Sequence, residues 1–415
     1  MKALFVCLTD YQMLNALNIK VNLLKNKDAD ILFFDNKEGH RKLAERLSQT
    51  GVFKNVFLHQ FTNVKGLHKY LRGKIDGVNF GSAAINSAGE IKYKALCKLL
   101  GKKYKINAKL YDNKRINFAD YDDLYGIPTK DVVKDTMKMV LAENKTAKVN
   151  FIEDGTSTYW KRSIKTDLPV NSIYLYQPEL ANYYDDSKYR DRIKFIPQIN
   201  WDDDEFRKLI NFVFGFKKTD TEYNNKVIFF DQNWDPMPEY LQNLKGIKKI
   251  VLQKHYKKHL KESTIYDKKM QMFRVLADKI SDSNRVIVKL HPRSDNAFIK
   301  DYLKSPCHMA ENVKVPWEVV EDNCVFTNNI WVTVSSTALC TYKMIFADSR
   351  EDIPMIFLYK IVYDGNKSYQ EDDKFFRSFQ KKYRQSVFIP KTTEEFTQIY
   401  KKLITKMDDK RKDNK

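Results

Sequence analysis

The sequence has few cysteines, no CxxC spacing and no long hydrophobic run, and these absences exclude several classes of protein. Its five cysteines are an odd number, so no disulfide framework is expected. The longest apolar stretches, such as residues 353–358, are far shorter than the roughly 20 residues of a membrane-spanning helix. Residues 1–8 lack a small-residue cleavage site and predict a first strand rather than a signal peptide. These absences predict a protein of the reducing cytoplasm.

What the sequence does have is an excess of positive charge. Its 415 residues include 73 Lys and Arg against 53 Asp and Glu, a formal charge of +20, and 43% are hydrophobic. That fraction can bury a large core, which excludes a disordered basic tail, and the length suggests about two or three domains. Residues 51–150 hold 19 basic and 9 acidic residues, interleaved with tyrosines. They indicate either solvated helix faces or a surface that meets a polyanion. The cations expected on that surface are Lys69, Arg72, Lys102, Lys103 and Lys105.

Short β-rich runs alternate with helical periodicity along the chain, which is typical of βαβ units and parallel sheets. An early helix is expected over residues 13–26, and the polar stretch 217–226 predicts a linker between two α/β domains. The two domains are expected to be Rossmann-like and to face each other across a cleft. The predicted boundaries are 1–218 for the N-terminal domain, 226–390 for the C-terminal domain, and 391–415 for a C-terminal helix and basic tail.

An acidic pair follows the expected strand 149–152. Open α/β sheets bind ligands beyond the carboxyl ends of their strands, so residues directly after a strand are the informative ones. Glu153, Asp154 and Gly155 occupy that place. One acid can face the cleft as a general base while the other orients the loop. An acidic turn or a helix-capping pair is the structural alternative.

Two further polar segments follow strands in the second half of the chain. His291 and Pro292 come after strand 286–290, where the imidazole would suit a phosphate, a buried structural histidine being the alternative. Ser335 and Ser336 follow the strand that ends at residue 334 and open a helix, which indicates an anion site or simple helix capping. Together with the acidic pair, these segments predict group transfer from a nucleotide donor to a hydroxyl.

The three segments, in this order, resemble the short motifs shared by bacterial sialyltransferases: an acidic pair with Gly, an HP motif and an S-S/T motif. The stretch Ile152-Glu153-Asp154-Gly155-Thr156-Ser157-Thr158-Tyr159 resembles the capsular polysialyltransferases in particular. Glu318, in Val315-Pro316-Trp317-Glu318, fits the position of the family's ribose-binding acid. The resemblance covers roughly residues 150–340, whereas the first 120 residues resemble the family only loosely.

The resemblance implies a GT-B fold, CMP-sialic acid as donor, inversion at the anomeric carbon, and no metal or other cofactor. Glu153 would be the general base, with Asp154 and Gly155 orienting its loop. His291 would contact the phosphate of CMP and help neutralise it. Pro292 and Glu318 would line the nucleotide site, and Ser335 and Ser336 would bind the phosphate. A base at Glu153 would work better with a pKa raised towards neutrality by burial.

The expected acceptor is a growing polysialic acid chain of a bacterial capsule, made by a cytoplasmic enzyme that is peripheral on the inner membrane. A capsule-assembly complex and the anionic membrane surface are further expected partners, the latter for the basic tail 401–415. One alternative acceptor is the terminal galactose of a lipooligosaccharide or capsule repeat, and one alternative donor is CMP-Kdo. A nucleic-acid partner is not expected, because no RNP, helix-turn-helix or zinc spacing accompanies the positive charge.

Overall fold

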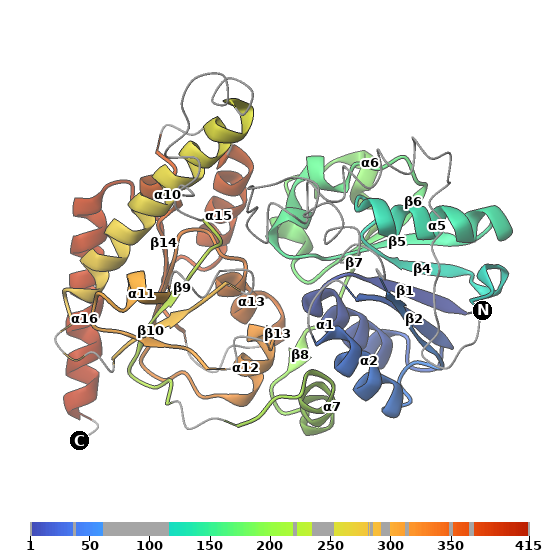
Figure 1. Cartoon of the computed structure of the whole chain (residues 1–415), viewed down its shortest axis with the longest axis horizontal. Coiled ribbons are helices and arrows are strands. Elements are labelled where there is room, and N and C mark those ends of the chain that lie inside the picture. Colours follow the sequence, from blue (N-terminus) through green and yellow to red (C-terminus); the bar gives the residue numbers. More distant parts are fainter. Residues whose placement is uncertain are drawn as a thin grey trace, which may run out of the picture.

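The chain folds into two parallel sheets, each with helices on both faces (Figure 1). The computed structural model describes residues 2–35, 39–60, 116–218, 222–234, 253–280, 282, 285–291, 299–311, 315–347, 352–364 and 369–413. The sheet of the N-terminal domain has the strand order β3-β2-β1-β4-β5-β6-β7, and that of the C-terminal domain has β11-β10-β9-β12-β14-β15. The predicted pair of Rossmann-like domains is thereby confirmed, and two such domains placed side by side are the GT-B arrangement.

The N-terminal domain contains seven strands in its sheet. They are β1 (Ala3–Cys7), β2 (Ala29–Asp35), β3 (Val56–Gln60), β4 (Asp123–Gly126), β5 (Lys148–Ile152), β6 (Val170–Leu175) and β7 (Ile193–Phe195). The described helices of this half are α1 (Asp10–Asn18), η1 (Ile19–Leu23), α2 (His40–Gln49), η2 (Phe118–Asp120), α5 (Asp131–Glu143), η3 (Thr156–Tyr159), η4 (Lys161–Ile164), η5 (Pro178–Leu180), α6 (Ser187–Arg190) and α7 (Asp204–Phe214).

The C-terminal domain contains six strands in its sheet. They are β9 (Val227–Phe230), β10 (Val286–Lys289), β11 (His308–Met309), β12 (Ile330–Thr333), β14 (Met355–Phe357) and β15 (Val387–Phe388). The described helices of this half are α10 (Gln253–Ala277), α11 (Ile299–Tyr302), α12 (Trp317–Asn323), α13 (Ala338–Met344), α14 (Tyr359–Val362), α15 (Gln370–Lys382) and α16 (Thr393–Asp413). Within the described residues, every helix is too short or too polar to span a bilayer.

Both faces of the first sheet are buried at its central strand β1, which explains why β1 is apolar throughout. Phe5 and Cys7 point into the larger core together with α1 and α2, whereas Leu4 and Val6 point into a smaller core under α5. Successive side chains of a strand point to opposite faces, so only a strand covered on both sides has no polar alternation. This burial holds the carboxyl ends of the strands, and the loops that follow them, in fixed positions.

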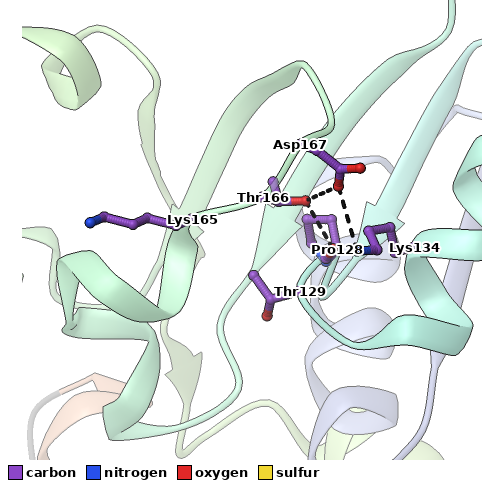
Figure 2. A pocket seen from close by; sticks show the side chains of 6 residues that line it. All are labelled: Pro128, Thr129, Lys134, Lys165, Thr166 and Asp167. Atoms are coloured by element: carbon purple, nitrogen blue, oxygen red, sulfur yellow. Dashed lines mark hydrogen bonds and ion pairs between the residues drawn. The ribbon is translucent and has the colours of Figure 1, made fainter.

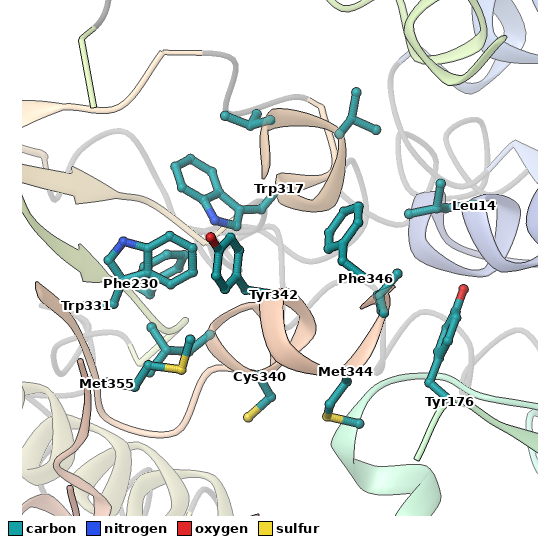
Figure 3. Close-up of a cluster of buried hydrophobic side chains, with 14 of the residues drawn as sticks. Leu14, Tyr176, Phe230, Trp317, Trp331, Cys340, Tyr342, Met344, Phe346 and Met355 are labelled. Carbon is teal, nitrogen blue, oxygen red and sulfur yellow. The ribbon is translucent and has the colours of Figure 1, made fainter. Parts of the chain in front are cut away.

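The two domains share one hydrophobic core. One buried cluster contains Leu14 and Tyr176 of the N-terminal domain together with Met344 and Phe346 of the C-terminal domain. Figure 3 shows these four residues on the same side of the cluster. Trp201 stacks on Phe346 with ring centroids 4.0 Å apart.

A short strand pair also joins the domains. Strand β8 (Ile199–Asn200) pairs in parallel with β13 (Phe346–Ala347). Beside it, Gln198 Nε2 donates to the carbonyl oxygens of Met344 and Phe346, at 3.1 Å each. This strand pair is called the interdomain seam below. Residues of the N-terminal half therefore contact the C-terminal domain before the chain reaches 217–226.

Candidate functional site

The order of the strands indicates where each sheet binds a ligand. The chain turns from one side of the sheet to the other between β1 and β4 in the N-terminal domain, and between β9 and β12 in the C-terminal domain. Doubly wound sheets bind ligands in the crevice outside the carboxyl ends of the strands at this point. The loops that follow β1, β9 and β12, together with the loop after the nearby β5, are therefore the segments from which a site can be built.

Glu153 follows β5 and is buried, with 1% of its surface exposed. Its carboxylate accepts three hydrogen bonds. Tyr11, on α1, donates its hydroxyl to Oε1 at 2.8 Å. Tyr159 donates its hydroxyl to Oε2 at 2.5 Å, and the backbone N–H of Tyr176 donates to the same oxygen at 3.0 Å. The backbone carbonyl of Glu153 accepts from Asn15 Nδ2 at 3.0 Å, so α1 holds both the side chain and the main chain.

Burial raises the pKa of the Glu153 carboxyl group to about 7. The three hydrogen bonds favour the ionised form and oppose this rise, and the neighbouring charge of Asp154 adds to it. A carboxyl group with a pKa near 7 is half ionised at neutral pH and binds a proton more strongly than an ordinary glutamate. Glu153 thus has the environment that a general base of this kind needs.

Asp154 and Gly155 fix the loop that carries Glu153. Gln12 Nε2 donates to Asp154 Oδ1 at 2.9 Å, and the backbone N–H of Asp154 donates to Thr158 Oγ1 at 2.7 Å. Gly155 has φ +74°, a conformation that strongly favours glycine. A Cβ atom there would lie 2.8 Å from Cγ2 of Thr337.

The acidic loop touches the serine segment of the other domain. Thr156 Oγ1 and Thr337 Oγ1 lie 3.2 Å apart and share a hydrogen bond across the domain boundary. Thr337 directly follows the predicted pair Ser335 and Ser336. The structure therefore brings two of the three sequence-predicted segments together.

Ser335 and Ser336 follow β12 and are partly exposed. Gln232, which follows β9, accepts from the Ser335 backbone N–H at 2.9 Å and donates to its hydroxyl at 3.0 Å. The hydroxyl of Ser335 also lies 2.9 Å from that of Tyr363, and the Ser336 N–H donates to Thr333 Oγ1 at 3.0 Å. Neither serine is the N-cap of α13, because that place belongs to Thr337. Both backbone N–H groups are used within the protein, so a phosphate would meet the hydroxyls first.

A buried ion pair between Lys269 and Asp231 holds the main chain at Gln232. Lys269 Nζ lies 2.6 Å from Asp231 Oδ1 and also donates to the carbonyl oxygen of Gln232 at 3.0 Å. The hydroxyl of Tyr302 donates to the same Asp231 oxygen. Lys269 and Asp231 are 2% and 3% exposed. A buried pair of this kind costs several kcal/mol when one partner is lost, so it holds the loop after β9 in place.

Glu318 lies in the first turn of α12 and is buried. Burial raises its pKa, while its own backbone N–H and the ammonium group of Lys289 act in the opposite direction. The charge of Glu318, the predicted nucleotide-site acid, contributes to the raised pKa of Tyr11, whose phenol binds Glu153. Glu321, one turn further along α12, is fully buried, and burial together with the charge of Glu318 raises its pKa well above the ordinary value.

Of the remaining predicted site residues, the structure describes only His291. His291 lies just after β10, two residues beyond the buried Lys289, and is partly exposed. Pro292 lies outside the described residues, and so do all five cations of the predicted polyanion surface: Lys69, Arg72, Lys102, Lys103 and Lys105.

A separate cavity opens at the carboxyl end of β4, the strand beside β5. It has a volume of about 460 Å³ and is lined by Pro128, Thr129, Lys134, Lys165, Thr166 and Asp167. Figure 2 shows Lys165 directed away from the others, while Lys134 faces Asp167, 3.6 Å away. None of the sequence-predicted site residues lines it. In the part of the chain that the structure describes, no three His, Cys, Asp or Glu side chains gather as a metal site would require, and metal independence stays a prediction.

Sequence reasoning missed the residues that surround Glu153 and Ser335. Tyr11, Gln12 and Asn15 lie on the helix after β1, and Gln232 lies in the loop after β9. The expected helix 13–26 begins earlier, at Asp10, because the Thr9 hydroxyl accepts from the Gln12 N–H at 3.2 Å and caps it. The rule that informative residues follow strands would have found these residues if it had been applied to β1 and β9 as well.

Comparison with known proteins gives likenesses of fold. No family model and no curated protein matches the chain. It is similar to Arabidopsis thaliana UGT89C1 complexed with UDP-L-rhamnose, at 9% identity and a TM-score of 0.45 over 94% of this chain and 85% of that one. It is also similar to the glycotransferase of kitacinnamycin, at 10% identity and 0.42 over 97% and 90%, and to a UDP-N-acetylglucosamine 2-epimerase, at 12% identity and 0.39 over 93% and 91%. Such distant likenesses carry no information about substrate.

Proposed function

We propose that this chain is a glycosyltransferase that moves sialic acid from CMP-sialic acid to the end of a polysialic acid chain, with inversion and without a metal. The observation that carries the proposal is the contact between the two domains at Thr156 and Thr337. It sets a loop with a near-neutral carboxyl group against the hydroxyl segment of the opposite sheet. The choice of sialic acid rests on the resemblance of the three motifs to sialyltransferases.

The proposed reaction is a single displacement. The acceptor hydroxyl oxygen attacks the anomeric carbon of sialic acid, its proton passes to Glu153, and the bond to CMP breaks so that CMP leaves with the electron pair. Because a carboxylate accepts this proton only when ionised, transfer requires Glu153 in its basic form. Ser335 and Ser336 would bind the departing phosphate through hydrogen bonds, His291 would help neutralise it, and Glu318 would bind the ribose.

Exposed cations near the acidic loop support a polyanionic acceptor. Helix η4 begins at Lys161, directly after Trp160, and its residues Lys161 and Arg162 are exposed, as is Lys165 just beyond it. Lys161 forms an ion pair with Asp186 at 2.5 Å. The guanidinium of Arg162 lies over the ring of Trp160, 4.9 Å from its centroid. Polysialic acid carries one carboxylate per sugar, so exposed cations that follow the acidic loop along the chain would attract it.

Elongation of an oligosialic acid primer by the purified chain tests this function. With CMP-sialic acid as donor, we expect a ladder of longer products, and Glu153→Gln should lose roughly 10²- to 10⁴-fold in rate. Glu205→Gln is the matched control, because Glu205 is an exposed glutamate of α7 that pairs only with Lys208 among the contacts described. Transfer to a galactose-ended acceptor without elongation of the primer would contradict the polysialic acid assignment. Use of CMP-Kdo in place of CMP-sialic acid would contradict the donor.

A further inference from the structure

The three hydrogen-bond donors around Glu153 differ in how easily each can leave. Tyr159 is fully buried, and its hydroxyl is tied in turn to the Gln177 backbone N–H, which donates to it at 3.3 Å. The second donor is the main chain of Tyr176 and cannot rotate away. Tyr11 is partly exposed and lies in the first turn of α1. Of the three donors described, the Tyr11 hydroxyl is thus the one that belongs to a partly exposed side chain and has no second described hydrogen bond.

The acceptor hydroxyl needs the place that Tyr11 occupies. A general base must approach the proton that it removes to about 2.6–3.2 Å. Two donors already fill Oε2, and with 1% of Glu153 exposed there is no room for a second hydroxyl on Oε1 while the phenol remains. The phenol is itself a neutral hydroxyl donor at 2.8 Å, which is the geometry expected of the substrate hydroxyl.

We propose that Tyr11 is a positioning residue whose hydroxyl holds the place of the acceptor hydroxyl on Glu153 Oε1 and leaves it when the acceptor binds. This inference rests on the proposed function, in which Glu153 is the base. The inference adds that Tyr11 blocks Oε1 of Glu153 in the free protein, and that binding of the acceptor displaces Tyr11 from this oxygen. The charge of Glu318, on α12 of the C-terminal domain, also acts on the Tyr11 phenol and raises its pKa.

Other groups also face Glu153, and they stay in place in this scheme. Asp154 raises its pKa through charge, whereas Tyr159 and the Tyr176 N–H lower it through hydrogen bonds. Tyr183 and, from α13 of the other domain, Cys340 both feel its charge. Since none of these groups has to move when the acceptor binds, a change at Tyr11 alone separates the free protein from the complex.

The pH dependence of two kinetic constants tests the role of Tyr11. The profile of kcat/KM reports the free protein, and that of kcat reports the complex with substrate. Tyr11→Phe removes a hydrogen bond that favours the carboxylate, so the acidic limb of kcat/KM should move upward by about one pH unit. The acidic limb of kcat should stay where it is, because Tyr11 has already left. The KM for the primer should fall roughly two- to tenfold, since a competing hydrogen bond is gone.

Tyr159→Phe is the matched control. Its hydroxyl bonds Oε2 in both states, so both acidic limbs should move upward together. Thermal unfolding of the two variants shows whether each is folded. Equal shifts of both limbs in Tyr11→Phe, or a changed unfolding temperature with neither limb moved, would overturn the role of Tyr11 while leaving the proposed function intact. An absence of sialic acid transfer by the unmodified chain would overturn both.

Discussion

Replacement of Gly155 by alanine tests the contact between the domains most directly. Two separate penalties are expected. The backbone of Gly155, at φ +74° and ψ −165°, lies in a region that is almost restricted to glycine, and forcing another residue into it costs about 1–3 kcal/mol. The added methyl group would lie 2.8 Å from Thr337 Cγ2, closer than such atoms approach, and overpacking of this kind costs about 1–3 kcal/mol. The sum is roughly 2–6 kcal/mol.

A second substitution separates the two penalties. Thr337→Ser removes Cγ2 and keeps Oγ1, which would be 3.3 Å from the new methyl group and needs to shift only slightly. In urea unfolding, the double variant should recover the steric part, about 1–3 kcal/mol, and keep the backbone part. Transfer activity should follow the same order, because the loop also carries Glu153. If Thr337→Ser gave no recovery, or Gly155→Ala changed stability by less than about 0.5 kcal/mol, the contact would be wrong.

Three further predictions concern buried polar groups. Glu321 keeps its proton in the folded chain at pH values where the unfolded chain releases it, so stability falls as pH rises above the ordinary carboxyl pKa; Glu321→Gln should therefore raise the unfolding temperature relative to the unmodified chain more at pH 8 than at pH 5. Lys269→Met leaves Asp231 buried without its cation and should cost about 3–5 kcal/mol in urea unfolding, whereas Lys208→Met, at an exposed pair, should cost less than about 1 kcal/mol. Gln232→Ala leaves the Ser335 N–H unpaired; titration with CMP should show weaker binding, and unchanged binding would contradict a role for this loop in the donor site.

The sequence was sufficient to predict the architecture because the buried strands of both sheets are short apolar runs bounded by polar residues. Strand β6 and the edge strand β7 were not predicted, because Val170–Leu175 is only partly buried and Ile193–Phe195 is mostly exposed. Neither strand has an apolar run that would mark it. Strand β6 pairs with β5 and β7 pairs with β6, and no local pattern contains this pairing.

The candidate site was predictable where a residue with a reactive or ligand-binding side chain directly follows a strand, as at Glu153 and Ser335. The pKa of Glu153 was not, because it depends on burial and on donors from α1, η3 and the end of β6, which lie far apart in sequence. The same holds for Gln232, whose neighbour Ser335 is 103 positions away. Sequence spacing identifies the residue, and only the packed structure gives its proton affinity.

Helix α13 contacts the N-terminal domain at both of its ends. At its start, Thr337 meets Gly155 and Thr156, and just after its end Phe346 enters the interdomain seam. Seven helical residues span only about 10 Å, and a helix does not stretch. Helix α13 therefore keeps these two contacts at a fixed separation. A movement of the domains about the seam would break the contact of Thr337 with the acidic loop, and would thereby move Glu153 away from the serine segment.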